Sequence, residues 1–217
     1  MLNILVIAAA IILLTGLLNA EKKESLKGIL LTKPFLSALF IAALFLGFKA
    51  PSTYFYLIFA GLIFCYIGDI CLAFFFKKKI FTIGLAAFLI GHILYAAAFF
   101  YMSKIGVSTW ISLALVLIVG SVVFVKLKPY LGTMFVPVIV YIVIISIMVV
   151  AAATLLSNSS LSYQARLMSF CGALCFYVSD IFVARHRFVK KEFINRLIGL
   201  PLYYTAQFLI AFSAGLI

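Results

Sequence analysis

Long apolar stretches and short polar breaks alternate along the whole chain. Eight stretches are apolar on every side and close to the length of about 20 residues that an α-helix needs to cross a membrane. Transmembrane β-strands are about ten residues long and alternate with period two, so the pattern favours helices over a barrel. The predicted helices cover residues 2–19, 29–48, 54–76, 80–101, 108–125, 131–153, 163–184 and 194–217.

Composition supports an all-α membrane protein with eight transmembrane helices. Apolar residues make up 67% of the 217 residues and charged residues only 10%, whereas a soluble domain has roughly 45–50% and about 25%. The formal net charge is +12, but no polar domain exists that could present a basic face to nucleic acid. We therefore expect residues 1–217 to form a single polytopic domain with no nucleic-acid partner.

The basic residues predict the orientation of the chain in the membrane. Only Lys49, Lys104 and Arg166 lie in the breaks after the second, fourth and sixth helices. The other breaks, with the edges of the helices that follow them, hold Lys22, Lys23, Lys27, Lys33, Lys77, Lys78, Lys79, Lys126, Lys128, Arg185, Arg187, Lys190, Lys191 and Arg196. Under the positive-inside rule this larger set is cytoplasmic, so both termini are predicted to be non-cytoplasmic.

Asp69 and Asp180 are the only aspartates of the chain, and both lie inside predicted helices. A carboxyl group at membrane depth costs about 3 kcal/mol or more, so such a residue marks a candidate functional site. A shift of 111 positions aligns Gly61, Tyr66, Asp69, Ile70 and Ala73 with Gly172, Tyr177, Asp180, Ile181 and Ala184. This match predicts a parallel four-plus-four internal repeat, related by an axis along the membrane normal.

Other polar groups inside the helices lie mostly in the predicted cytoplasmic half of the membrane. Tyr66 and Tyr177 stand three residues before the two aspartates and therefore on the same helix faces. The further groups are Lys33 at the edge of the second helix, His92, Tyr95, Tyr141, Tyr203, Tyr204 and Gln207. Together they predict a polar pocket open to the cytoplasm. The alternative is that they only join helices by hydrogen bonds worth around 0.6 kcal/mol each.

Two neighbouring acids in an apolar environment resist simultaneous ionisation, so one tends to keep its proton near neutral pH. Such a pair suits hydrolysis of an acid-labile ether or acetal through an oxocarbenium ion, and it suits proton-coupled transport of a small or lipidic solute equally well. A non-catalytic membrane subunit is the third interpretation. The four cysteines lack metal-ligand spacing, and His186 is the only second histidine, so neither a metal nor a cofactor is predicted.

Several motifs follow one another from the second to the eighth predicted helix. They are Lys33-Pro34, Gly61-Leu62-Ile63-Phe64 leading to Gly68-Asp69, Phe88-Leu89-Ile90-Gly91-His92-Ile93-Leu94-Tyr95, Val136-Pro137-Val138 with Tyr141 and Met148, Ser179-Asp180 with Ala184 and Arg187-Phe188, and Tyr203-Tyr204-Thr205-Ala206-Gln207. As a set they resemble the YhhN-like lysoplasmalogenase family of eight-helix membrane proteins.

The resemblance implies hydrolysis of the vinyl ether bond of lysoplasmalogens to a fatty aldehyde and a glycerophospho-base. One aspartate, Asp69 or Asp180, would protonate the vinyl ether carbon, and the other would position or deprotonate water. The partner is then a lipid within the bilayer, and the expected location is a bacterial cytoplasmic membrane. The expected substrate-binding residues are Lys33, Tyr66, His92, Tyr95, Tyr141, Tyr177, Ser179, Tyr203, Tyr204 and Gln207, with Lys33 and the basic rim near the lipid phosphate.

Overall fold

The computed structural model describes residues 2–47, 50–75 and 77–217. Over these residues the chain forms eight long α-helices and no strand, which confirms the predicted helical class and helix number. The long helices are α1 (Leu2–Lys22), α2 (Leu26–Leu46), α3 (Thr53–Ala73), α4 (Lys78–Tyr101), α5 (Val107–Leu127), α6 (Phe135–Leu155), α7 (Tyr163–Ala184) and α8 (Phe193–Ser213). Three short helical turns are η1 (Lys128–Tyr130), η2 (Gly132–Met134) and η3 (Arg185–Val189).

The differences between predicted and observed helix bounds have local causes. Helix α2 begins at Leu26 because the Ser25 hydroxyl caps it, accepting a hydrogen bond of 3.2 Å from the Gly28 amide. Helix α6 begins only at Phe135, since η1 and η2 form the preceding turn. In that turn Gly132 has a φ of +48°, a conformation that favours glycine. The predicted helix ends at residues 48 and 76 lie outside the described residues.

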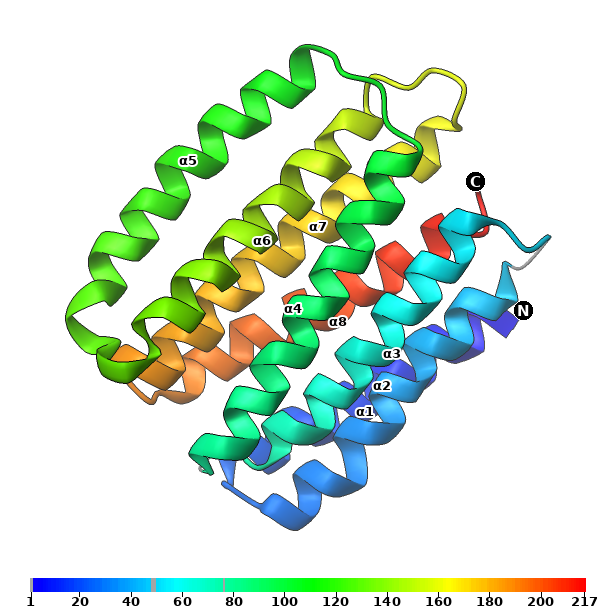
Figure 1. Cartoon of the computed structure of the whole chain (residues 1–217). Helices are drawn as coiled ribbons and strands as arrows, with labels where there is room; N and C mark the ends of the chain where they lie inside the picture. The colour runs from blue at the N-terminus through cyan, green and yellow to red at the C-terminus, as the bar shows by residue number, and fades with distance from the viewer. Residues whose placement is uncertain (1, 48–49, 76) are drawn as a thin grey trace.

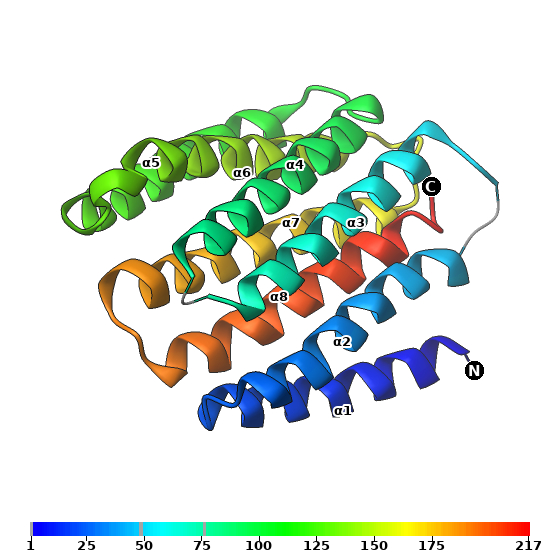
Figure 2. The ribbon, with the colours of Figure 1, turned by 60° about the horizontal axis from the view of Figure 1, so that its bottom comes forward.

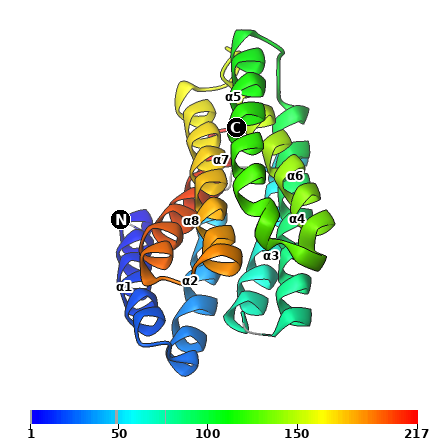
Figure 3. The same ribbon diagram turned by 90° about the vertical axis from the view of Figure 1, so that its left-hand side faces the viewer.

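The helices run alternately up and down (Figure 1), so that the α1–α2, α3–α4, α5–α6 and α7–α8 connections lie at one end and both termini at the other. Helix α8 is interior, and it packs against α1, α2, α3 and α7 (Figure 2). Helix α5 lies on the outside of the bundle in front of α6, its main neighbour (Figure 3). The polar residues of α8 are therefore surrounded by protein.

Seven of the helices in the described part of the chain are long and apolar enough to cross a membrane. The exception is α8, whose 21 residues have sufficient length but include several buried polar side chains. These are Asn195, Arg196, Tyr203, Tyr204, Gln207 and Ser213. Because its neighbours shield these groups from lipid, α8 meets the requirement that polar groups at membrane depth are enclosed by protein. Its membrane crossing stays a prediction.

Glycines bring the hairpin partners α3 and α4, and likewise α7 and α8, into close contact. A Cβ atom on Gly91 would lie 2.8 Å from the Cys65 Sγ atom and 3.2 Å from the Gly61 carbonyl oxygen. A Cβ atom on Gly172 would lie 2.8 Å from Ile210 Cγ1. Small residues at such contacts allow helix backbones to approach closely inside a membrane. Asp69 and Asp180 are thus carried by two tightly packed hairpins.

The four connections richest in lysine and arginine all lie at the end of the bundle opposite the termini. By the positive-inside rule we expect a reporter fused after Ile217 to be active only when it requires a non-cytoplasmic location. The matched control is the same reporter inserted after Lys77 in the α3–α4 connection, which should give the opposite result. Activity of the Ile217 fusion in the cytoplasm alone would overturn the predicted topology.

Candidate functional site

A cavity lies near the basic end of the bundle and is lined by both intramembrane aspartates, Asp69 from α3 and Asp180 from α7. It offers about 90 Å³ to the centres of water molecules, several times the 10–15 Å³ or so that one water needs. The rest of its wall is mostly apolar. The other polar residues of the wall are Lys33, Tyr141, Tyr177, Ser179, Asn195, Arg196 and Tyr203. One cavity therefore gives both acids access to the same small molecule.

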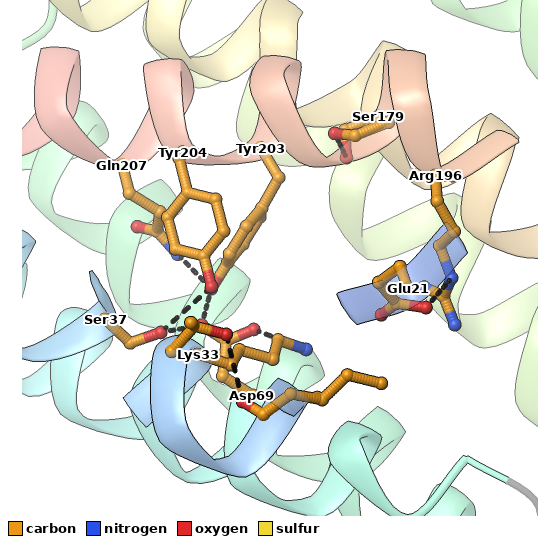
Figure 4. A network of polar contacts seen from close by, with 12 residues as sticks. Glu21, Lys33, Ser37, Asp69, Ser179, Arg196, Tyr203, Tyr204 and Gln207 are labelled. Atoms are coloured by element: carbon orange, nitrogen blue, oxygen red, sulfur yellow. Dashed lines mark hydrogen bonds and ion pairs between the residues drawn. The ribbon is translucent and has the colours of Figure 1, made fainter. Parts of the chain in front are cut away.

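Asp69 is held by three side chains from the neighbouring helices (Figure 4). The Lys33 Nζ atom of α2 lies 3.1 Å from its Oδ1 atom, and this ion pair is almost completely buried. The Ser37 and Tyr203 hydroxyls donate hydrogen bonds of 2.7 and 2.6 Å to its Oδ2 atom. A buried charge with a counter-ion and further hydrogen bonds is compensated, so this environment supports an ionised carboxylate.

A second layer of hydrogen bonds orients the groups around Asp69. The Gln207 side-chain amide donates to the Tyr203 hydroxyl at 3.0 Å and accepts from the Tyr95 hydroxyl at 2.8 Å. The Tyr204 and Ser37 hydroxyl oxygens lie 3.3 Å apart (Figure 4). Tyr95, Tyr204 and Gln207 are buried outside the cavity wall. These three predicted site residues therefore contact the side chains around Asp69 rather than the cavity itself.

Asp180 has a different environment from Asp69. The Tyr141 hydroxyl donates a hydrogen bond of 2.6 Å to its Oδ2 atom. No described lysine or arginine lies within ion-pairing distance of Asp180, and its side chain is 16% exposed. The structure thus places two acids on one cavity, of which Asp69 has a cation and Asp180 has only a neutral hydroxyl donor.

His92 lies beside Asp180, with its Nε2 atom 3.9 Å from the same carboxylate oxygen, too far for a hydrogen bond. The fully buried ring packs edge to face against Tyr141 and Phe176, at centroid distances of 5.2 and 4.5 Å. Neither ring nitrogen has a hydrogen-bond partner within the described residues. His92 is outside the cavity wall, so it can affect Asp180 through position but not by direct contact with a bound molecule.

Two sequence-based placements differ from the structure. Tyr66 is partly buried against the apolar core and does not line the cavity, although its repeat partner Tyr177 does. The cavity is displaced toward α7, so that α3 reaches it only through Asp69 and Leu72. Lys33 is not at the edge of its helix, because α2 begins seven residues earlier, and it is buried against Asp69. Ser179 lines the cavity, and its hydroxyl donates to the Gly199 carbonyl at 3.0 Å.

Three polar residues of the site were not predicted: Ser37, Asn195 and Arg196, of which Asn195 and Arg196 line the cavity. Ser37 lies four residues after Lys33, and this spacing on one helix face was the available signal. Arg196, which the charge pattern assigned to the cytoplasmic rim, lies in the first turn of α8 and lines the cavity. Its Nε atom is 3.4 Å from the Glu21 carboxylate of α1 (Figure 4). Its guanidinium lies over the Phe75 ring. Arginine commonly stacks on aromatic rings in this way.

The sequence profile of the YhhN family matches residues 28–214, which include every site residue from Lys33 to Gln207. The chain belongs to the YhhN family. This confirms the resemblance drawn from the motifs. A curated relative of this YhhN-family chain is the lysoplasmalogenase TMEM86A of Bos taurus, 34% identical over 178 residues, which are 81% of this chain and 72% of the relative.

The human lysoplasmalogenase TMEM86A is 30% identical to the YhhN-family chain over the same coverage of both proteins. No solved structure shows a significant match to the chain. The fold and the geometry of the site in this YhhN-family member are therefore described from its own structure.

Proposed function

We propose that the protein is a membrane lysoplasmalogenase, which hydrolyses the vinyl ether bond of lysoplasmalogen-type lysophospholipids to a fatty aldehyde and a glycerophospho-base. The observation that carries the proposal is that Asp69 and Asp180 line one cavity with unequal partners. The names of the bovine and human relatives support the same reaction. The proposed setting is a bacterial cytoplasmic membrane, with the cavity on the cytoplasmic side.

Asp180 is the proposed general acid. Burial without a cation favours an uncharged carboxylic acid, and Asp180 receives only the Tyr141 hydroxyl. The proton of Asp180 is transferred to the terminal carbon of the C=C–O unit, and the ether carbon becomes an oxocarbenium ion. Proton transfer by a positioned acid of this kind contributes about 10²–10⁴ to the rate.

Asp69 is the proposed general base, because its charge is compensated by Lys33. Its carboxylate takes a proton from a water molecule in the cavity as the water oxygen bonds to the oxocarbenium carbon. The resulting hemiacetal then collapses. Asp180 takes the hemiacetal hydroxyl proton, Asp69 returns its proton to the leaving alcohol oxygen, and the aldehyde is released. Both acids end in their starting protonation states.

Arg196 is the proposed partner of the lipid phosphate. It lines the cavity in the first turn of α8, at the end that carries the basic connections. Arginine binds phosphate oxygens through two parallel N–H donors. This proposal replaces Lys33, which was expected near the phosphate, because the Lys33–Asp69 ion pair at 3.1 Å is shorter than the Arg196–Glu21 pair at 3.4 Å.

The decisive experiment is to incubate the purified protein in detergent with a lysoplasmalogen and measure the fatty aldehyde. We expect aldehyde and glycerophospho-base in equal amounts. The matched control is the alkyl-ether analogue, which lacks the double bond and cannot form the oxocarbenium ion by protonation, so it should yield no aldehyde. Proton-dependent solute flux into liposomes without any product would favour the alternative of a proton-coupled transporter.

A further inference from the structure

A second cavity lies on the outer side of the bundle, between α5 and α6, with Phe100 of α4 at one edge. It offers about 350 Å³ to the centres of water molecules. Its wall is apolar apart from the hydroxyls of Ser121 and Ser146. Helix α5 buries only Ser112, Val116, Gly120 and Leu127, so the cavity borders on the bilayer. We refer to it as the α5–α6 groove.

The α5–α6 groove adjoins the cavity of the two aspartates. Ile142 of α6 belongs to the wall of both. Gly120 of α5 lies at this junction, because a Cβ atom there would be 3.5 Å from Ile142 and 3.4 Å from the Tyr177 hydroxyl. Tyr177 lines the aspartate cavity and Gly120 lines the groove. Because position 120 has no side chain, the two cavities approach each other here with Ile142 and the Tyr177 hydroxyl between them.

The geometry points to a binding site for the alkenyl chain of the lysolipid in the α5–α6 groove, an inference that rests on the proposed function. A lysolipid carries its phosphate, its ether bond and its single hydrocarbon chain in that order. The structure offers Arg196, the two aspartates and an apolar groove in the same order. Because the groove adjoins the aspartate cavity at Gly120, a chain lying in it would keep its ether bond near Asp180.

The position of the groove along the helices also fits a membrane lipid. The aspartate cavity touches Val123 and Leu127 near the end of α5, whereas the groove extends back along that helix to Leu113. A chain in the groove would thus run from the basic end of the bundle toward the middle of the membrane. This is the direction that a lipid chain takes in the leaflet on that side. The substrate would enter sideways, past the exposed face of α5.

The test is the dependence of kcat/KM on the length of the alkenyl chain. Gly120→Leu places a side chain in the junction, and Ser146→Leu fills the groove from α6. Each variant should lower kcat/KM more strongly for a substrate with a chain of about 16 carbons than for a substrate with a chain of about eight carbons, and the difference should be about tenfold or more. The reason is that each methylene displaced from an apolar pocket lowers kcat/KM by about tenfold or more. The matched control is Ala114→Leu, on an exposed position of α5 outside the groove wall.

The outcomes separate the groove from the proposed function. If the parent protein releases aldehyde but both variants keep its chain-length profile, the groove does not hold the chain, and surrounding bilayer lipid fills it instead. The same conclusion follows if Ala114→Leu changes the profile as much as Gly120→Leu. If the parent protein releases no aldehyde from any lysoplasmalogen, the proposed function fails first. A profile shifted toward short chains by either groove variant alone supports the assignment.

Discussion

Asp69→Asn and Asp180→Asn should each lower the rate of aldehyde release by about 10²–10⁴. Asparagine keeps the size and the hydrogen-bonding capacity of aspartate but cannot exchange a proton near neutral pH. The amide oxygen in Asp69→Asn can still accept from the Ser37 and Tyr203 hydroxyls, but the buried Lys33 ammonium loses its counter-ion, so this variant should also be less stable by about 3–5 kcal/mol. The measurement is single-turnover aldehyde release by detergent-purified variants, made at a temperature at which thermal unfolding shows that each variant and the parent protein are folded.

The double Asn variant should be little worse than the poorer single variant, because residues that act as a unit are non-additive. His92→Gln is the matched comparison, since His92 lies 3.9 Å from Asp180 but outside the cavity wall. We expect a smaller loss there, as no step of the proposed reaction uses the imidazole. Folded Asn variants that release aldehyde at the parental rate would end the two-acid mechanism.

Lys33→Met should destabilise the protein by about 3–5 kcal/mol, because it removes the cation from a buried ion pair and leaves the Asp69 carboxylate uncompensated. The pair is almost entirely shielded, with side-chain exposures of 5% and 2%. Methionine has a similar length, so loss of packing contributes little. The measurement is the midpoint of thermal unfolding in one detergent.

The rescue variant for this prediction is Lys33→Met combined with Asp69→Asn, which removes both charges. It should regain most of the lost stability while remaining inactive. Lys27→Met is the matched control on the same helix, because Lys27 is exposed and an exposed charge contributes little. If Lys33→Met and Lys27→Met unfold at the same temperature, the buried ion pair does not stabilise the fold.

The helices and the two acids were predictable from the sequence for a simple physical reason. A membrane demands long apolar segments, so a lone aspartate such as Asp69 or Asp180 stands out against them. Whether a charged residue near a helix end is buried could not be predicted in the same way. Arg196 and Lys33 looked like part of the basic rim, because sequence alone does not show that a charged side chain near the membrane edge points inward.

The internal repeat predicts matching surroundings for the two aspartates, and the structure shows where the match ends. The same shift that aligns Asp69 with Asp180 aligns Lys33 with Ile144 and Ser37 with Met148. The second half of the chain therefore has no counterpart of the cation that pairs with Asp69. The unequal roles proposed for the two acids come from these substitutions on α2 and α6, which become informative only once their contacts are known. The repeat itself stays a prediction.

The line of hydrogen bonds from Asp69 through Tyr203 and Gln207 to Tyr95 points away from the basic end of the bundle. Hydroxyl groups can receive and release protons, but the Gln207 amide donates through nitrogen and accepts through oxygen in fixed roles. The line therefore cannot conduct protons past Gln207. The other hydroxyls linked to Asp69, those of Ser37 and Tyr204, have no further hydrogen-bond partner among the described residues. Neither line therefore extends across the membrane, so acid–base chemistry at Asp69 can proceed without a leak that would dissipate the transmembrane electrochemical gradient.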